Sequence, residues 1–154
     1  MDRRLILFWV LSFLTGWYGF STKSHANEVG FKQYRENVLN QIEEYEKALE
    51  TDPSDPQIHF QLGLSYMALG RHEKEIDEYL EAIRLKPDFA EAHFNLAQAY
   101  DLLKDGVHSI RHMLRARQIY SAHRNHRGIR TSQRQLRALY DKYGFQPEDV
   151  IGPK

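Results

Sequence analysis

The sequence predicts an all-α protein built from helical hairpins that repeat along the chain. Between residues 28 and 143, apolar residues recur at steps of three and four, the spacing of one helix face. No segment of strand length alternates between apolar and polar residues. Residues 56–69 are echoed 34 residues later, and the matched pairs are His59 and His93, Leu62 and Leu96, Tyr66 and Tyr100, and Leu69 and Leu103. Such a fixed period is typical of stacked-repeat proteins.

Composition fits one modest globular domain of 154 residues, with 42% hydrophobic and 27% charged residues. The formal net charge is zero, but residues 28–105 hold 17 acidic and 8 basic side chains, whereas residues 106–137 hold 8 arginines and no acid. There is no cysteine, which excludes disulfides, a thiolate nucleophile, a thiolate metal site and a lipidated cysteine.

Residues 1–26 have the pattern of a targeting segment. Arg3 and Arg4 precede the apolar run 5–14, and Ser24 and Ala26 provide small residues before a cut at Asn27, as in a signal peptide. The alternative is an uncleaved membrane anchor that extends to Phe20, about 24 Å of helix against a hydrocarbon core of about 30 Å. Both interpretations place the rest of the chain outside the cytoplasm, periplasmic or secreted if cleaved and membrane-anchored if not.

The first expected helix covers residues 28–51 and ends before Pro53. Asp55 followed by Pro56 marks the next start, because an aspartate caps the helix and proline lacks an N–H that the first turn would leave unpaired. The first hairpin is expected over residues 56–69 and 72–85, with its turn at Gly70. Asp88 and Glu91 resemble a capping box at the start of a helix over residues 90–103.

The next helix is expected over residues 107–121, followed by a polar bend over residues 122–128. A last helix over residues 129–143 carries an apolar stripe and an opposite basic face, and Gly144 supplies its stop. Residues 145–154 are expected to form a loose tail.

These residues resemble the tetratricopeptide repeat family, whose 34-residue pattern has a large residue, Leu-Gly, Tyr, small and aromatic residues in a second helix, and a closing Pro. His59 and His93 stand at the large-residue position. The structural matches are Leu62, Gly63, Tyr66, Tyr79, Ala82 and Pro87 in one repeat, and Leu96, Ala97, Tyr100 and Ala116 in the next.

The resemblance implies a short solenoid of about 2.5 repeats: a partial repeat over about 37–55, repeats over 56–89 and 90–121, and a capping helix over about 128–143. The chain departs from the pattern at Lys104, which replaces the turn glycine, and at Ser121, which replaces the proline. Glu75 replaces an alanine at a crowded contact, and we expect its carboxylate to lean out to solvent because burying it unpaired is costly.

The resemblance also implies that first helices line a concave face that binds partners. The groove candidates are Gln57, Phe60, Gln61, Leu64, Met67, Glu91, Phe94, Asn95, Gln98 and Asp101. Phe60 and Phe94 are expected to stack side by side, at positions where family members that bind chaperone tails carry a basic clamp. The expected ligand is an apolar or basic peptide or helix. The alternative is that both phenylalanines pack against the chain's own first helix.

A basic patch is the second candidate surface, comprising Arg111, Arg115, Arg124, Arg127, Arg130, Arg134 and Arg137. It suits anionic lipid or an acidic partner, including the acidic half of another copy, and the alternative is a solvated cap. Nucleic acid is not expected, because only Tyr120 interleaves with these arginines and a stacking platform is missing.

Catalytic, cofactor and metal sites are not expected. His108 and His112, and His123 and His126, have spacings that can share an ion, but arginines lie beside the first pair. No phosphate loop or nucleophile elbow is present. The expected function is a non-catalytic, exported scaffold for protein–protein interaction. The alternative is a membrane-tethered or self-associating protein that uses its basic helices.

Overall fold

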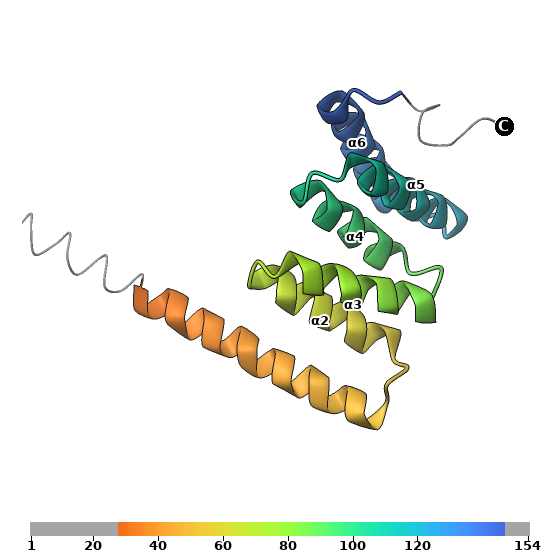
Figure 1. Ribbon diagram of the computed structural model, residues 1–154. Helices are drawn as coiled ribbons and strands as arrows, with labels where there is room; N and C mark the ends of the chain where they lie inside the picture. The colour runs from red at the N-terminus through yellow and green to blue at the C-terminus, as the bar shows by residue number, and fades with distance from the viewer. Residues whose placement is uncertain (1–27, 147–154) are drawn as a thin grey trace, which may run out of the picture. The chain divides into compact units, whose positions relative to one another are not determined.

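The computed structural model describes residues 28–146, and within that range it contains helices and no strand (Figure 1). Residues 28–51 are helical, and the later helices are α2 Pro56–Ala68, α3 His72–Leu85, α4 Ala90–Leu102, α5 Gly106–Ala122 and α6 His126–Tyr143. The all-α prediction is confirmed. The predicted targeting segment, and the tail beyond residue 146, lie outside the described residues. The chain divides into a unit ending at Leu39 and a unit beginning at Asn40.

The turns that follow α2, α4 and α5 each contain a left-handed residue. Gly70 follows α2 with φ 68°, Lys104 follows α4 with φ 62°, and Arg124 follows α5 with φ 56°. The left-handed region favours glycine, so Lys104 and Arg124 are held there by the helices they connect. Asp55 caps α2 as predicted, since its carboxylate accepts a hydrogen bond from the Gln57 N–H at 2.7 Å.

The cap of α4 and the start of α6 differ from the sequence prediction, whereas α4 begins at Ala90 as expected. The capping box at Asp88 and Glu91 does not form; Phe89 occupies the N-cap of α4 without a side-chain hydrogen bond and is itself buried. Helix α6 begins at His126 rather than at residue 129, because the Asn125 side chain accepts a hydrogen bond from the Gly128 N–H at 2.9 Å. The polar bend is therefore shorter than predicted.

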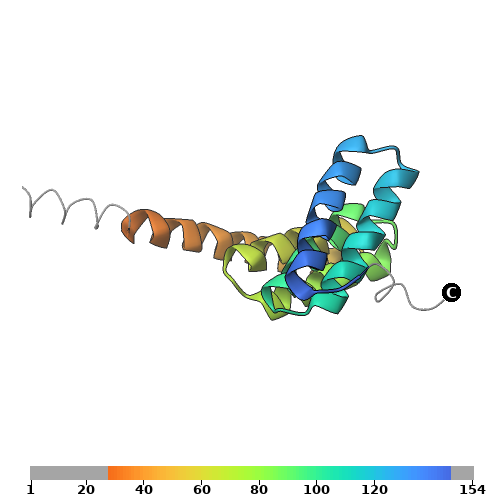
Figure 2. The same cartoon turned by 90° about the horizontal axis from the view of Figure 1, so that it is seen from above.

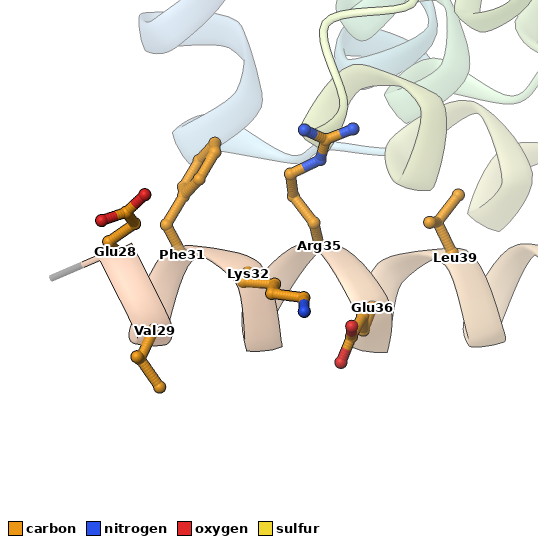
Figure 3. Close-up of a pocket in the computed structure, with 7 residues that line it drawn as sticks. All are labelled: Glu28, Val29, Phe31, Lys32, Arg35, Glu36 and Leu39. Atoms are coloured by element: carbon orange, nitrogen blue, oxygen red, sulfur yellow. The ribbon is translucent and has the colours of Figure 1, made fainter. Parts of the chain in front are cut away.

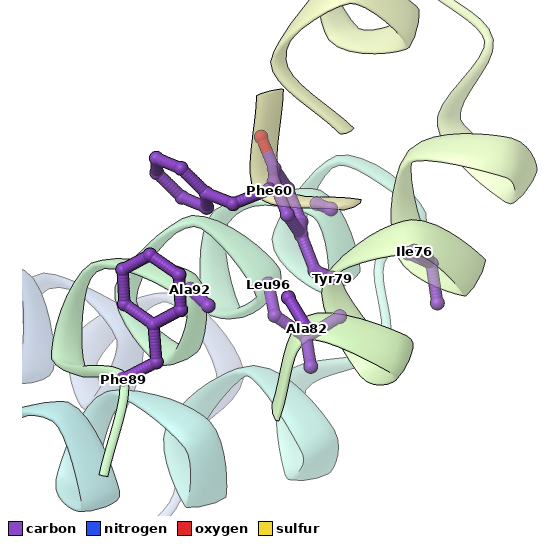
Figure 4. Packing of buried hydrophobic residues seen from close by; sticks show 8 residues of the cluster. Phe60, Ile76, Tyr79, Ala82, Phe89, Ala92 and Leu96 are labelled. Carbon is purple, nitrogen blue, oxygen red and sulfur yellow. The ribbon is translucent and has the colours of Figure 1, made fainter. Parts of the chain in front are cut away.

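The core between α2, α3 and α4 is aromatic and tightly packed (Figure 4). The ring of Phe60 lies 5.7 Å from that of Tyr79 and 4.9 Å from that of Phe89. Phe94 belongs to the next clusters, which join α4 to α5 and α6. The predicted stack of Phe60 on Phe94 was wrong, because Phe89 fills the space beside Phe60 where the two repeats meet.

Gly63 permits the close approach of α2 and α3. A Cβ atom at this position would stand 2.4 Å from Cε1 and 2.6 Å from Cδ1 of Tyr79, a ring with no exposed surface. The two helices can therefore be this close only because position 63 has no side chain.

Glu75 is buried, contrary to the expectation that it leans out. Its exposed fraction is 1%, and one carboxylate oxygen lies 2.8 Å from Nδ1 of His72, one turn earlier on α3. Burial raises the pKa of Glu75, and the hydrogen bond and charge of His72 oppose that shift. The local histidine partner makes burial of this carboxyl tolerable.

Helix α6 closes the second unit by packing against α5, and the two run side by side in Figures 1 and 2. Leu136 and Leu139 enter a cluster with Ala97, Ile110 and Met113. At its C-terminal end, Lys142 Nζ lies 2.7 Å from the Asp101 carboxylate of α4, and the Tyr143 hydroxyl donates to the same oxygen at 2.8 Å. The last helix is thus fixed to both helices of the preceding hairpin.

The described part of the first unit is the helical segment 28–39. Val29 and Phe31 are 60% and 62% exposed. Figure 3 shows the residues that line a surface hollow along this segment; Phe31, Arg35 and Leu39 project from one side and Val29 from the other. Among the described residues, no helix is long and apolar enough to cross a membrane.

Candidate functional site

The predicted groove residues lie on α2 and α4, with equivalent positions 34 residues apart in neighbouring helices. Most of them keep some exposed surface: Gln57, Met67, Glu91 and Gln98 are exposed, while Gln61, Leu64, Phe94, Asn95 and Asp101 are partly buried. Phe60 differs, since it is 9% exposed and belongs to the core cluster. The remaining nine can contact a ligand without unfolding.

A hollow of about 190 Å³ opens beside Phe94, between α4 and the start of α6. Its other lining residues are Tyr120, Asn125, Arg127, Gly128 and Thr131. A Cβ atom on Gly128 would stand 2.5 Å from Cγ of Tyr120, so the glycine lets the Tyr120 ring lie against the first turn of α6. The hollow therefore has an aromatic floor and one cation, Arg127, at its edge.

Both signs of charge are present around this hollow. Burial raises the pKa of Tyr120 to about 12, and the charge and hydrogen bonding of Glu91 add to the shift. Glu91 on α4 therefore lies close to the Tyr120 hydroxyl. Further along α4, Asp101 is engaged by Lys142 and Tyr143 of α6. A ligand would meet Glu91 and Arg127 as charges that no ion pair neutralises within residues 28–146.

Sequence reasoning missed that Tyr120, Asn125, Gly128 and Thr131 share a hollow with Phe94. The predicted groove residues lie on α2 and α4 alone. The available signal was the position of α6, which follows α5 as the next first helix of the array and therefore extends the same face.

His59 and His93, at equivalent repeat positions, each bridge the two helices of their hairpin. His59 Nδ1 lies 2.7 Å from the Glu78 carboxylate, and its Nε2 lies 3.4 Å from the Pro53 carbonyl. One repeat later, His93 Nε2 lies 3.4 Å from the Pro87 carbonyl, and its Nδ1 lies 3.1 Å from His112 Nδ1. The prediction that these histidines replace a large aromatic residue beside the core agrees with their burial.

The pair formed by His93 and His112 is poorly placed to carry charge. Burial lowers the pKa of His112 to about 4, with smaller contributions from His93, His108 and Arg111. Burial also lowers the pKa of His93. A hydrogen bond between two Nδ1 atoms requires one to donate and the other to accept, which two neutral rings satisfy. Across the described residues, no group of three or more metal-ligating side chains is present.

All seven arginines of the basic patch are exposed. Arg84 and Lys142 are the only Lys or Arg side chains in an ion pair across residues 28–146, so none of the seven is paired there. Arg127, Arg130, Arg134 and Arg137 follow one another at steps of three and four along α6. Because Ser132, Leu136 and Leu139 are the buried residues of α6, these arginines point away from the core.

Comparison with known proteins agrees with this geometry. The family model described as a TPR repeat matches residues 42–70 and 65–103. A search of curated proteins finds no match for the sequence.

Several solved structures have a similar fold. The type III secretion translocator chaperone SycD of Yersinia enterocolitica is 15% identical, with a TM-score of 0.66 over 77% of this chain and 83% of SycD. PcrH, solved with the chaperone-binding region of PopD, is 18% identical, with a TM-score of 0.67 over 80% of this chain and 94% of PcrH. The TPR2B domain of yeast Sti1, solved with pHsp70, is 17% identical, with a TM-score of 0.65 over 70% of this chain and 86% of that domain.

The sequence match and the helical geometry concern the same residues. The matched range covers residues 42–51 of the preceding helix together with α2, α3 and α4, and the close contact at Gly63 and the left-handed turn at Gly70 lie within it. Residues 42–103 of this chain therefore contain tetratricopeptide repeats.

Proposed function

We propose that this protein is a non-catalytic scaffold that binds a polypeptide segment on the face formed by α2, α4 and the start of α6. The observation that carries the proposal is the hollow beside Phe94, which offers a partly buried aromatic ring and Tyr120 to an entering side chain. Apolar pockets with a few polar groups at their edge are where side chains of bound peptides are held.

The similar structures support a polypeptide ligand. PcrH was solved with a region of PopD, and the Sti1 domain with pHsp70. In this chain, exposed polar groups on α2 and α4, such as Gln57 and Gln98, could pair with the backbone of an extended segment. The aromatic floor then provides the apolar contact that fixes its register.

The test is selection of peptides from a random display library on the full-length chain, followed by fluorescence anisotropy with the selected peptides. Phe94→Ala should weaken binding by about tenfold or more, because truncation of a central aromatic residue commonly costs about 2 kcal/mol. Asp77→Ala on the exposed surface of α3 is the matched control and should leave binding unchanged. Equal binding by the Phe94 variant and the wild type would refute the proposal.

Phe60→Ala is not a suitable probe of this face. Phe60 contacts Tyr79 and Phe89 in the core, so its truncation would change stability before it changed a binding surface. Phe94 has to be tested alone.

We further propose that the scaffold works outside the cytoplasm, on the basis of the basic start, apolar run and small residues within residues 1–26. N-terminal sequencing of the mature protein separates the two forms of this proposal. A start at Asn27 indicates cleavage and release, whereas an intact Met1 in the membrane fraction indicates an anchor. Recovery of the whole chain in the cytoplasmic fraction would contradict both.

A further inference from the structure

We propose that the arginine stripe of α6 binds the glutamate edge of the helix at residues 40–51 in a second copy of this chain. The arginine stripe consists of Arg130, Arg134 and Arg137, and the glutamate edge of Glu43, Glu46 and Glu50. All six residues are exposed. This association goes beyond peptide binding and uses neither the hollow beside Phe94 nor the groove residues of α2 and α4.

Within the described part of the chain, no ion-pair partner faces the arginine stripe. No ion pair involves these three arginines across residues 28–146, and the only acid on α6 is Asp141. Like charges at steps of three and four on one helix repel each other and destabilise it. Helix α3, by contrast, carries both signs, and its Glu81 and Arg84 form an ion pair. An exposed stripe that carries only positive charge is typical of a surface that an acidic partner neutralises.

The glutamate edge has the complementary character. Its helix carries Glu44 as a further acid and Lys47 as the only base between residues 40 and 51. Glu46 accepts a hydrogen bond from the Tyr66 hydroxyl of α2 at 3.0 Å, which fixes the edge to the first hairpin and leaves its second oxygen for another donor. The edge and the stripe thus lie on the first and last helices of the second unit.

The spacings of the two surfaces match in antiparallel orientation. The glutamates advance by three and then four residues, and the arginines, taken from Arg137 back to Arg130, advance by the same steps. Each set spans about 10 Å along its helix at about 1.5 Å per residue. Arginine forms bidentate pairs with carboxylates, which favours this residue over lysine for such a contact.

The charge distribution favours a second copy of this chain, rather than a different acidic protein, as the partner of the arginine stripe. The formal charge of the chain is zero, yet an acidic region, residues 28–105, and a basic region, residues 106–137, carry net charges of opposite sign and similar magnitude. One copy offers both surfaces, and each remains free after the other is used. Contacts of this heterologous kind extend into rings or filaments rather than stopping at a symmetric dimer.

Sedimentation velocity of the full-length chain in one non-ionic detergent tests the association. The mean sedimentation coefficient should rise with protein concentration at ~0.01 M salt and stop rising at ~1 M salt, where the Debye length falls from about 30 Å to about 3 Å. Arg130→Glu/Arg137→Glu and Glu43→Lys/Glu50→Lys should each abolish the concentration dependence. The control Glu73→Lys/Asp77→Lys on α3 makes the same change in net charge as Glu43→Lys/Glu50→Lys and should keep the concentration dependence.

Restoration experiments make the test specific for these two surfaces. A mixture of the two reversed variants should associate again, because each then offers a surface that complements the other. A chain carrying all four substitutions should self-associate like the wild type, and this result also shows that the reversed surfaces are folded.

The proposal is wrong if the wild type stays monomeric at low salt, or if the reversed variants associate as the wild type does. It is also wrong if the α3 control loses self-association to the same extent, or if the mixture of the two reversed variants fails to associate. Vesicles containing phosphatidylserine test the lipid alternative. If the arginine variant loses vesicle binding while its self-association is unchanged, the stripe contacts lipid and the inference is wrong.

Discussion

Substitution of Gly63 probes the contact on which the first hairpin depends. A glycine within a helix is normally destabilising, so replacement by alanine should add about 1 kcal/mol of stability at an open site. Here the new Cβ would stand 2.4 Å from Cε1, 2.6 Å from Cδ1 and 3.1 Å from Cζ of Tyr79. The ring has no exposed surface and packs against Phe60, so it has little room to move.

Overpacking of a tight core costs about 1–3 kcal/mol. Gly63→Ala should therefore lose its normal gain and end at or below wild-type stability. Gly63→Leu should lose about 3 kcal/mol or more, which for a chain of this size corresponds to a fall in Tm of about 6 °C or more. Thermal unfolding followed by circular dichroism measures both changes.

Gly30→Ala supplies the matched control. Gly30 is also helical, but nothing lies within 4 Å of an added Cβ, so this variant should gain stability. A second test combines Gly63→Ala with Tyr79→Leu; removing the ring removes the collision, and the two effects should be clearly less than additive. If Gly63→Ala raises Tm as Gly30→Ala does, the close contact does not limit the packing of α2 on α3.

Three further variants test other buried contacts. Glu75→Gln should stabilise the protein near neutral pH and match the wild type below about pH 4.5. Burial raises the pKa of Glu75, so the wild type loses stability as the pH rises and the buried carboxyl becomes charged, whereas glutamine stays neutral. A difference in urea midpoint between variant and wild type that does not change with pH would contradict this. His112→Gln should reduce the loss of stability between pH 6.5 and about 4, where the wild type must charge a buried imidazole; an unchanged Tm–pH profile would count against it. Tyr143→Ala should speed amide exchange in α6 but not in α3, since Tyr143 fixes the end of α6 to Asp101; equal protection in both proteins would be inconsistent with that role.

Helix positions and turns followed closely from sequence, because period and local chemistry decide them. Asp55 and Pro56 start α2 by the mechanism expected of them. Lys104 takes the left-handed conformation expected of a turn glycine, so the repeat pattern located the turn even where the residue type had changed. In both cases the residues that determine the helix start or the turn lie within a few positions of it in the sequence.

The Asn125 cap was overlooked even though its signal is local. The polar run after Ser121 indicated a bend, yet an asparagine three residues before a glycine N–H was enough to begin α6 at His126. Composition alone cannot separate a polar loop from the polar first turn of a surface helix, since both are solvated.

The different settings of Phe60 and Phe94 could not be read from their shared repeat position. The neighbour of Phe60 is Phe89, and the residue 34 positions after Phe89 is His123, which is largely exposed. Phe94 therefore lacks the aromatic neighbour that buries Phe60. It stays partly open beside Tyr120, and the hollow there is a consequence of imperfect repetition.

The same imperfect repetition gives the equivalent histidines of the two hairpins different partners. At equivalent positions, His59 faces the carboxylate of Glu78, whereas His93 faces the imidazole of His112. Burial lowers the pKa of both His93 and His112, and protonation of either ring places a cation beside the other ring in a buried site. Acidification should consequently loosen the α4–α5 hairpin. Because Phe94 lies on α4, the proposed peptide site should weaken with the second hairpin, while Gln57 and Met67 on α2 keep their positions.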